Sequence, residues 1–92
     1  MLLFTVDNCP RCMQIKNLFD KTNMQYQAIN GVVLFEGLHA AVGNIRVELS
    51  MKNWDKQFPV IVDGQNVYTY KEFCTKFNLP DLNNCENGSC RL

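Results

Sequence analysis

The junction between a strand-like run and a helix-like run near the N-terminus most constrains the fold of this chain. Residues 2–6 are an apolar run, typical of a buried strand in a sheet that is covered on both faces. Asp7-Asn8 interrupts the run, and Cys9-Pro10-Arg11-Cys12 opens a helical pattern with an apolar face of Met13, Ile15, Leu18 and Phe19. Pro10 suits the first turn of a helix, where its missing N–H costs little. We therefore expect a buried strand that leads directly into a helix ending near Asn23.

The rest of the chain alternates strand-like and helix-like segments. Residues 24–29 are predicted to be a strand, and residues 59–62 and 66–68 a hairpin that turns at Asp63-Gly64. Residues 44–53 are predicted to be helical, whereas the glycines of residues 31–44 leave either a shorter helix or an irregular segment open. The pattern predicts one α/β domain, residues 1–80, followed by a cysteine-containing tail, residues 81–92.

The last helix carries clear signals at both of its ends. Thr69 and Glu72 have the spacing of a capping box, and Asn78-Leu79-Pro80 is typical of a helix end. Phe73, Cys74 and Phe77 are predicted to share its apolar face. Cys74 is accordingly interpreted as a core residue.

Charge and hydropathy argue against two classes of partner. Nine basic and nine acidic residues cancel and are scattered along the chain, which is unlike a nucleic-acid binding surface. No apolar run reaches membrane-spanning length, and no basic segment precedes the short apolar run at the N-terminus. We therefore expect a cytoplasmic monomer that binds neither nucleic acid nor membranes.

The chain contains five cysteines, a high and odd number for 92 residues. Without an export signal, such cysteines are typically catalytic or metal-binding rather than structural disulfides. Cys9 and Cys12 lie where the N–H groups and partial positive charge of a helix start favour a thiolate, and the second thiol can resolve a mixed disulfide. Alternatively, these two cysteines and the pair Cys85 and Cys90 hold zinc or an iron–sulfur cluster in a binding module without redox turnover. Asp7 would raise the pKa of Cys9 if it lay close, or else it caps the helix.

These motifs resemble those of the thioredoxin superfamily and, within it, the glutaredoxins. The resemblance covers roughly residues 1–79 and rests on Phe4-Thr5-Val6, Cys9-Pro10-Arg11-Cys12 and Phe58-Pro59-Val60-Ile61-Val62-Asp63-Gly64. It implies a thioredoxin fold, with a central mixed four-stranded sheet flanked by helices. It also implies a thiol–disulfide oxidoreductase with no bound cofactor or metal. Its substrates would be protein disulfides, with ribonucleotide reductase as one candidate, or glutathione mixed disulfides.

The resemblance also assigns roles to individual residues. Cys9 matches the exposed nucleophile of the family, and Cys12 matches its buried resolving thiol. Pro59 matches a cis-proline that presents the backbone of Phe58 to the substrate chain. Arg11, where many glutaredoxins have a tyrosine, is expected to contact the substrate and to favour the Cys9 thiolate.

One segment departs from the family pattern. Glutathione-using members usually have Gly-Gly and an acidic residue after the hairpin, where this chain has Tyr68-Thr69-Tyr70-Lys71. Tyr68 is therefore expected to line the substrate groove and to crowd glutathione. Either glutathione or a thioredoxin reductase remains a candidate electron donor. Cys85 and Cys90 are interpreted as a small disulfide loop or as an auxiliary redox pair.

Overall fold

The structure, a computed structural model of the 92-residue chain, describes residues 1–36 and 40–80. The predicted tail, with Cys85 and Cys90, lies outside the described residues. Within them the elements are, in chain order, β1 (Leu2–Thr5), α1 (Pro10–Lys21), β2 (Gln27–Asn30), α2 (Val33–Glu36), α3 (Ala40–Met51), β3 (Val60–Asp63), β4 (Asn66–Thr69) and α4 (Tyr70–Phe77).

The four strands form one mixed sheet in the order β2-β1-β3-β4. β1 and β2 are parallel and are connected through α1, whereas β3 runs antiparallel to both β1 and β4. Val60 pairs with Phe4 on one side and with Thr69 on the other, so the start of β3 lies in the middle of the sheet. The predicted α/β class with a central mixed sheet is confirmed.

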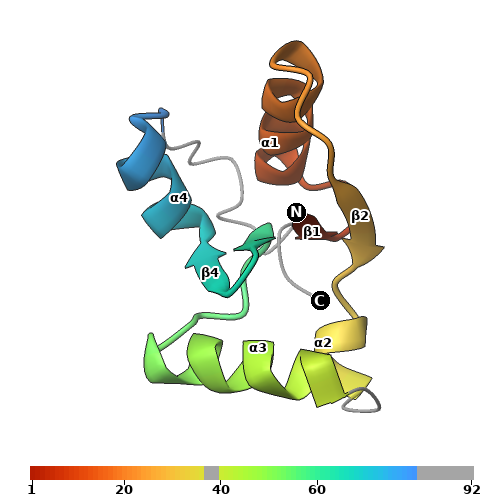
Figure 1. Cartoon of the computed structure of the whole chain (residues 1–92), viewed down its shortest axis with the longest axis vertical. Helices are drawn as coiled ribbons and strands as arrows, with labels where there is room; N and C mark the ends of the chain where they lie inside the picture. The colour runs from red at the N-terminus through yellow and green to blue at the C-terminus, as the bar shows by residue number, and fades with distance from the viewer. Residues whose placement is uncertain (37–39, 81–92) are drawn as a thin grey trace.

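Helices cover both faces of this sheet (Figure 1). On one face, α1 and α4 enclose a core that includes Leu3, Ile15, Phe19, Ile61 and Phe73. On the other face, α2 and α3 enclose a core that includes Phe4, Leu34, Leu49, Phe58 and Val60. Neighbouring strand residues point to opposite faces, which is why β1 and β3 supply side chains to both cores.

The first helix begins as predicted, but fewer of its apolar side chains are buried than the sequence predicted. α1 has Pro10 in its first turn, and Asn23 follows its end with a φ of 55°. Ile15 and Phe19 are buried, whereas Met13 is 61% exposed. β2 begins later than the predicted residue 24 and has mostly exposed side chains, because it lies at an edge of the sheet.

Residues 31–44, for which the sequence allowed either a short helix or an irregular segment, contain the short helix α2 and the start of α3. α3 begins at Ala40, earlier than the predicted residue 44, and Gly43 lies inside it. Gly43 lowers helix propensity, but the position where its side chain would be faces open space. Packing of Ile45 and Leu49 in the core outweighs that loss.

The hairpin forms with its turn one residue later than predicted. Asp63 pairs with Asn66, so Gly64 and Gln65 make the turn, and Gly64 has the positive φ of 61° that a glycine tolerates at this position. Among the described residues, no helix combines the length and the apolar character needed to cross a membrane.

Both predicted ends of α4 are confirmed. Thr69 Oγ1 accepts the Glu72 N–H at 3.3 Å, and Glu72 Oε1 accepts the Thr69 N–H at 3.1 Å. Asn78 ends the helix in the left-handed conformation. Phe73 and Cys74 are buried as predicted, but Phe77 is 49% exposed and packs against the ring of Phe73.

Candidate active site

The first turn of α1 brings the sulfur of Cys9 to the backbone of Cys12. Cys9 has extended backbone angles and is the N-cap of the helix, and its Sγ accepts the N–H of Cys12 at 3.2 Å. An N-cap side chain normally contributes an oxygen, so sulfur at this position is unusual. Asp7, the other predicted cap, is exposed and does not cap the helix. The hydrogen bond that starts α1 also stabilises negative charge on Cys9.

The two thiols have pKa values that move in opposite directions. The pKa of Cys9 is lowered from its ordinary value, first by the hydrogen bond from the Cys12 side chain. Burial opposes this shift, while backbone N–H groups of Cys12 and Arg11 and the Arg11 charge support it. The pKa of Cys12 is raised by the same side-chain hydrogen bond and by burial. Cys9 is thus the group that ionises, and Cys12 is the group that keeps its proton.

The peptide bond between Phe58 and Pro59 is cis, as the resemblance implied, and it faces Cys9. In its neutral form, Cys9 Sγ donates to the carbonyl oxygen of Phe58 at 3.7 Å. The Phe58 ring occupies the space beside Gly31, where any Cβ atom would overlap it. Gly31 in turn donates its N–H to the carbonyl of Thr5 at 2.7 Å, so the ends of β1 and β2 adjoin this ring.

Cys9 is buried, which makes the prediction of an exposed nucleophile wrong for this conformation. Cys9 and Cys12 are each 2% exposed, and Phe58 is 0% exposed. The reason is the position of Cys9 between the end of β1 and the start of α1, where it joins the core of Phe4 and Phe58. Neither thiol is therefore presented on the open surface in this conformation.

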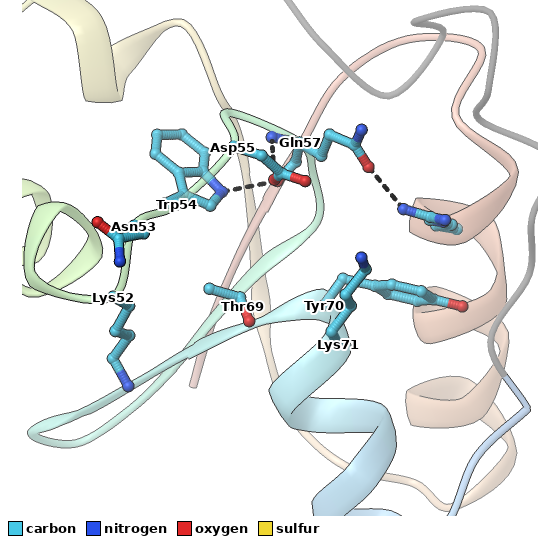
Figure 2. A pocket seen from close by; sticks show the side chains of 9 residues that line it. Lys52, Asn53, Trp54, Asp55, Gln57, Thr69, Tyr70 and Lys71 are labelled. Carbon is cyan, nitrogen blue, oxygen red and sulfur yellow. Dashed lines mark hydrogen bonds between the residues drawn. The ribbon is translucent and has the colours of Figure 1, made fainter.

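Arg11 is held beside the thiols by two residues that the sequence did not single out for this role. Its Nη1 donates to Gln57 Oε1 at 2.7 Å, and its guanidinium lies 4.8 Å from the centre of the Tyr70 ring (Figure 2). Tyr70 is itself fixed, because its hydroxyl donates to Gln14 Oε1 at 2.5 Å. Arg11 is only 6% exposed. Its charge is therefore fixed close to Cys9 rather than extended into solvent.

Tyr68 packs against the core under α1 and α4 rather than the core that contains the thiols, and its role in substrate binding stays a prediction. Its ring packs against Phe73 at a centroid distance of 6.2 Å, and its hydroxyl accepts from Lys76 Nζ at 2.6 Å. Side chains alternate along β4, so Val67 faces the core under α3 while Tyr68 faces α4. That alternation, already visible in the sequence, identifies the face to which Tyr68 belongs.

A groove of about 190 Å³ lies next to Arg11 (Figure 2). Trp54 forms part of its wall and donates its Nε1 hydrogen to the carbonyl of Gln57 at 2.9 Å. The ionisable residues around it are Arg11, Lys52, Asp55, Tyr70 and Lys71. The groove therefore has a polar, mainly cationic lining beside a dithiol.

The described residues do not assemble a metal site. No group of three or more His, Cys, Asp or Glu side chains within residues 1–36 and 40–80 is arranged to hold a metal ion. The four-thiolate alternative depends on Cys85 and Cys90, which lie outside that part of the chain. The sequence matches no known family profile and no curated protein.

Proposed function

We propose that this protein is a glutaredoxin-like thiol–disulfide oxidoreductase with a thioredoxin-type fold. The observation that carries the proposal is the position of Cys9 Sγ, 3.2 Å from the N–H of Cys12 and 3.7 Å from the carbonyl of Phe58, which precedes the cis bond to Pro59. Dithiol–disulfide exchange needs an ionised thiol with a protonated thiol beside it. The opposite pKa directions of Cys9 and Cys12 support these two roles.

In the first step, the thiolate of Cys9 attacks one sulfur of the substrate disulfide. The substrate S–S bond breaks, a mixed disulfide forms at Cys9, and the other substrate sulfur leaves as a thiolate that takes a proton from water. The lowered pKa of Cys9 provides the thiolate without a separate base.

In the second step, Cys12 resolves the mixed disulfide. The pKa of Cys12 is raised mainly by its hydrogen bond to Cys9, so formation of the mixed disulfide removes this cause and favours loss of the Cys12 proton. The Cys12 thiolate attacks Cys9 Sγ, which forms the Cys9–Cys12 disulfide and releases the second substrate thiol. Two electrons pass from the protein to the substrate, and an external thiol must then restore the dithiol.

Glutathione and a thioredoxin reductase both remain candidate electron donors. The steric objection to glutathione came from Tyr68, which faces α4 instead of the groove. Thr69 and Tyr70 line the groove in its place. Protein disulfides, including that of ribonucleotide reductase, are the proposed substrates.

A single-turnover assay tests the proposal. Reduced wild-type protein, Cys9→Ser and Cys12→Ser are each mixed with a protein disulfide, and the products are identified by mass spectrometry. We expect reduction by the wild type, none by Cys9→Ser, and a trapped mixed disulfide with Cys12→Ser. Addition of glutathione, or of a thioredoxin reductase with NADPH, then identifies the electron donor. Reduction by Cys9→Ser at the wild-type rate would refute the proposal, and stoichiometric metal without turnover would favour the metal-binding module.

A further inference from the structure

Two aromatic rings form a partly exposed surface close to the proposed active site. Phe35, from α2, and Trp54, which follows α3, stack with centroids 5.9 Å apart and planes 20° apart. We call this pair the aromatic ledge. Both rings also pack edge-on against Phe58, at centroid distances of 6.4 and 5.4 Å. Phe35 is 40% exposed and Trp54 is half-buried, so the ledge is accessible although Phe58 itself is not.

Cations line the pocket on one side of the ledge. Arg46 and Lys56 border a cavity of about 240 Å³ together with Leu34, Phe35, Ser50 and Trp54. None of these described lining residues is acidic. Arg46 and Lys56 are both exposed, so their charges face solvent at the mouth of this pocket.

Trp54 also borders the groove beside Arg11 (Figure 2), so this one ring lines both hollows. In that groove Lys52 is paired with Glu72 at 3.1 Å, whereas Lys71 is exposed. The groove's carboxylate, Asp55, accepts the N–H of Gln57 at 3.3 Å. The chain as a whole has equal numbers of acidic and basic residues. The cationic character is therefore a local property of the surface around the ledge.

We propose that the aromatic ledge binds an acidic protein segment that flanks the disulfide to be reduced. A large apolar or aromatic side chain of that segment packs on Phe35 and Trp54, and its carboxylates face Arg46 and Lys56. Burial of the apolar side chain supplies affinity, and the cations select the sign of the partner's charge and speed its encounter. The inference rests on the proposed function, because it names the class of protein substrate.

The position of the ledge also sets where this apolar residue lies in the substrate. The Phe58 ring touches the ledge, and the Phe58 carbonyl lies 3.7 Å from Cys9 Sγ. An extended chain advances about 3.3 Å per residue. The apolar residue therefore lies within a few residues of the cysteine that Cys9 attacks.

A binding measurement without thiol chemistry tests the ledge directly. The probe is a short fluorescent peptide with one phenylalanine among glutamates and no cysteine, compared with versions in which glutamine or lysine replaces every glutamate. Anisotropy titrations should show roughly tenfold tighter binding of the acidic peptide than of the glutamine version at low salt, with a smaller difference as salt rises. Equal binding of the three peptides would overturn the inference.

Matched charge reversals locate the binding surface. Arg46→Glu should lower the affinity for the acidic peptide severalfold. Lys21→Glu makes the same change of charge at the far end of α1 and should leave the affinity unchanged (Figure 1). Phe35→Ala should weaken binding of the phenylalanine peptide more than binding of its alanine version, with circular dichroism to verify the fold. Equal effects of Arg46→Glu and Lys21→Glu would also overturn the inference.

Reduction of a small neutral disulfide separates this inference from the proposed function. If that disulfide is reduced but the peptides bind alike, the docking surface is wrong and the oxidoreductase proposal stands. If the acidic peptide binds selectively but neither the small disulfide nor an acidic peptide disulfide is reduced, the proposed function is wrong. The ledge is then an acidic-segment binding surface, and its assignment as a substrate site is overturned.

Discussion

The helices α1 and α4 begin in contrasting ways. At α4, Thr69 and Glu72 exchange hydrogen bonds through their oxygens, and Glu72 also pairs with Lys52. At α1, the sulfur of Cys9 is the cap, the first turn holds no acidic residue, and Arg11 is buried there. The start of α4 has the features that stabilise a helix, whereas the start of α1 lacks most of them.

The comparison shows that helix stability accounts for the residues at the start of α4 but not for those at the start of α1. A neutral thiol is a weak hydrogen-bond acceptor, but a charged acceptor makes a markedly stronger bond. The cap of α1 therefore becomes effective when Cys9 is ionised. Structure and proposed chemistry depend on the same atom at α1, whereas the cap hydrogen bonds of α4 involve no thiol.

The largest expected effect comes from Cys9→Ser. Turnover should disappear, because a serine hydroxyl does not attack disulfides under these conditions. At a pH below the Cys9 pKa, the free energy of unfolding should change by less than about 1 kcal/mol, because the better neutral cap of serine offsets the loss of a buried apolar sulfur. Disulfide reduction and urea unfolding measure the two quantities, with Cys74→Ala as the control that keeps turnover. Retained turnover in Cys9→Ser would remove the contrast between the helix ends.

The next effect concerns the pKa of Cys9. Cys12→Ala should raise this pKa more than Arg11→Gln does, because the Cys12 side-chain hydrogen bond is the largest cause of the lowered value and the Arg11 charge a smaller one. The rate of alkylation by iodoacetamide against pH measures it, with Lys21→Gln as the control. The reverse order would mean that the Arg11 charge, rather than the hydrogen bond from the Cys12 thiol, sets the reactivity of Cys9.

The pH dependence of the free energy of unfolding tests whether ionisation of Cys9 stabilises the folded protein. Because the pKa of Cys9 is lower in the folded protein, the unfolded chain binds more protons between that pKa and the ordinary value of 9.0. The reduced wild type should therefore gain stability relative to Cys9→Ser as the pH rises through this window, and lose it as the pH falls through the lowered pKa. Above 9.0, the raised pKa of Cys12 makes stability fall with rising pH. Urea unfolding of both proteins across this range measures the difference, and parallel curves would contradict it.

For the Thr69–Glu72 cap of α4, the expected effects are smaller and concern stability. Thr69→Ala should lower the free energy of unfolding by about 1 kcal/mol, because the N–H of Glu72 loses its acceptor. Thr75→Ala, within the same helix, should be neutral or slightly stabilising. Reduction of a small disulfide should be unchanged in both variants. A loss of turnover in Thr69→Ala would show that the start of α4 has a chemical role as well.

The smallest effect should come from the ion pair at the same helix end. The Lys52 and Glu72 side chains are 29% and 43% exposed, so Lys52→Gln should cost less than about 1 kcal/mol, and less still at high salt. Lys71→Gln removes a cation from the first turn of α4 and should be neutral or stabilising. Chemical unfolding at two salt concentrations distinguishes these outcomes.

Local signals predicted the parts of the fold that depend on a few adjacent residues. The capping box at Thr69 and Glu72, the helix end at Asn78 and the helix start at Pro10 are all confirmed. Each of these features depends on hydrogen bonds or backbone angles within one turn of the chain. The cis bond before Pro59 is also present, but it was implied by resemblance rather than by any local signal.

Features that depend on tertiary packing were missed. The early start of α3 depends on core packing that outweighs Gly43. The burial of Cys9 depends in part on Phe58, which lies 49 residues away in the sequence. Gln57 and Tyr70 reach Arg11 from separate elements, so no sequence spacing connects them. The alternation of side chains along the strand would have placed Tyr68 correctly. The prediction followed the resemblance to a family pattern instead.

Gly31 limits how this sequence can change during evolution. Its missing side chain leaves the space that the Phe58 ring occupies, and the same residue 58 supplies the carbonyl that meets Cys9. Any larger residue at position 31 must push that ring aside unless a smaller one replaces it. Descendants of this chain should therefore keep glycine at 31 together with the aromatic at 58, or exchange both in the same lineage.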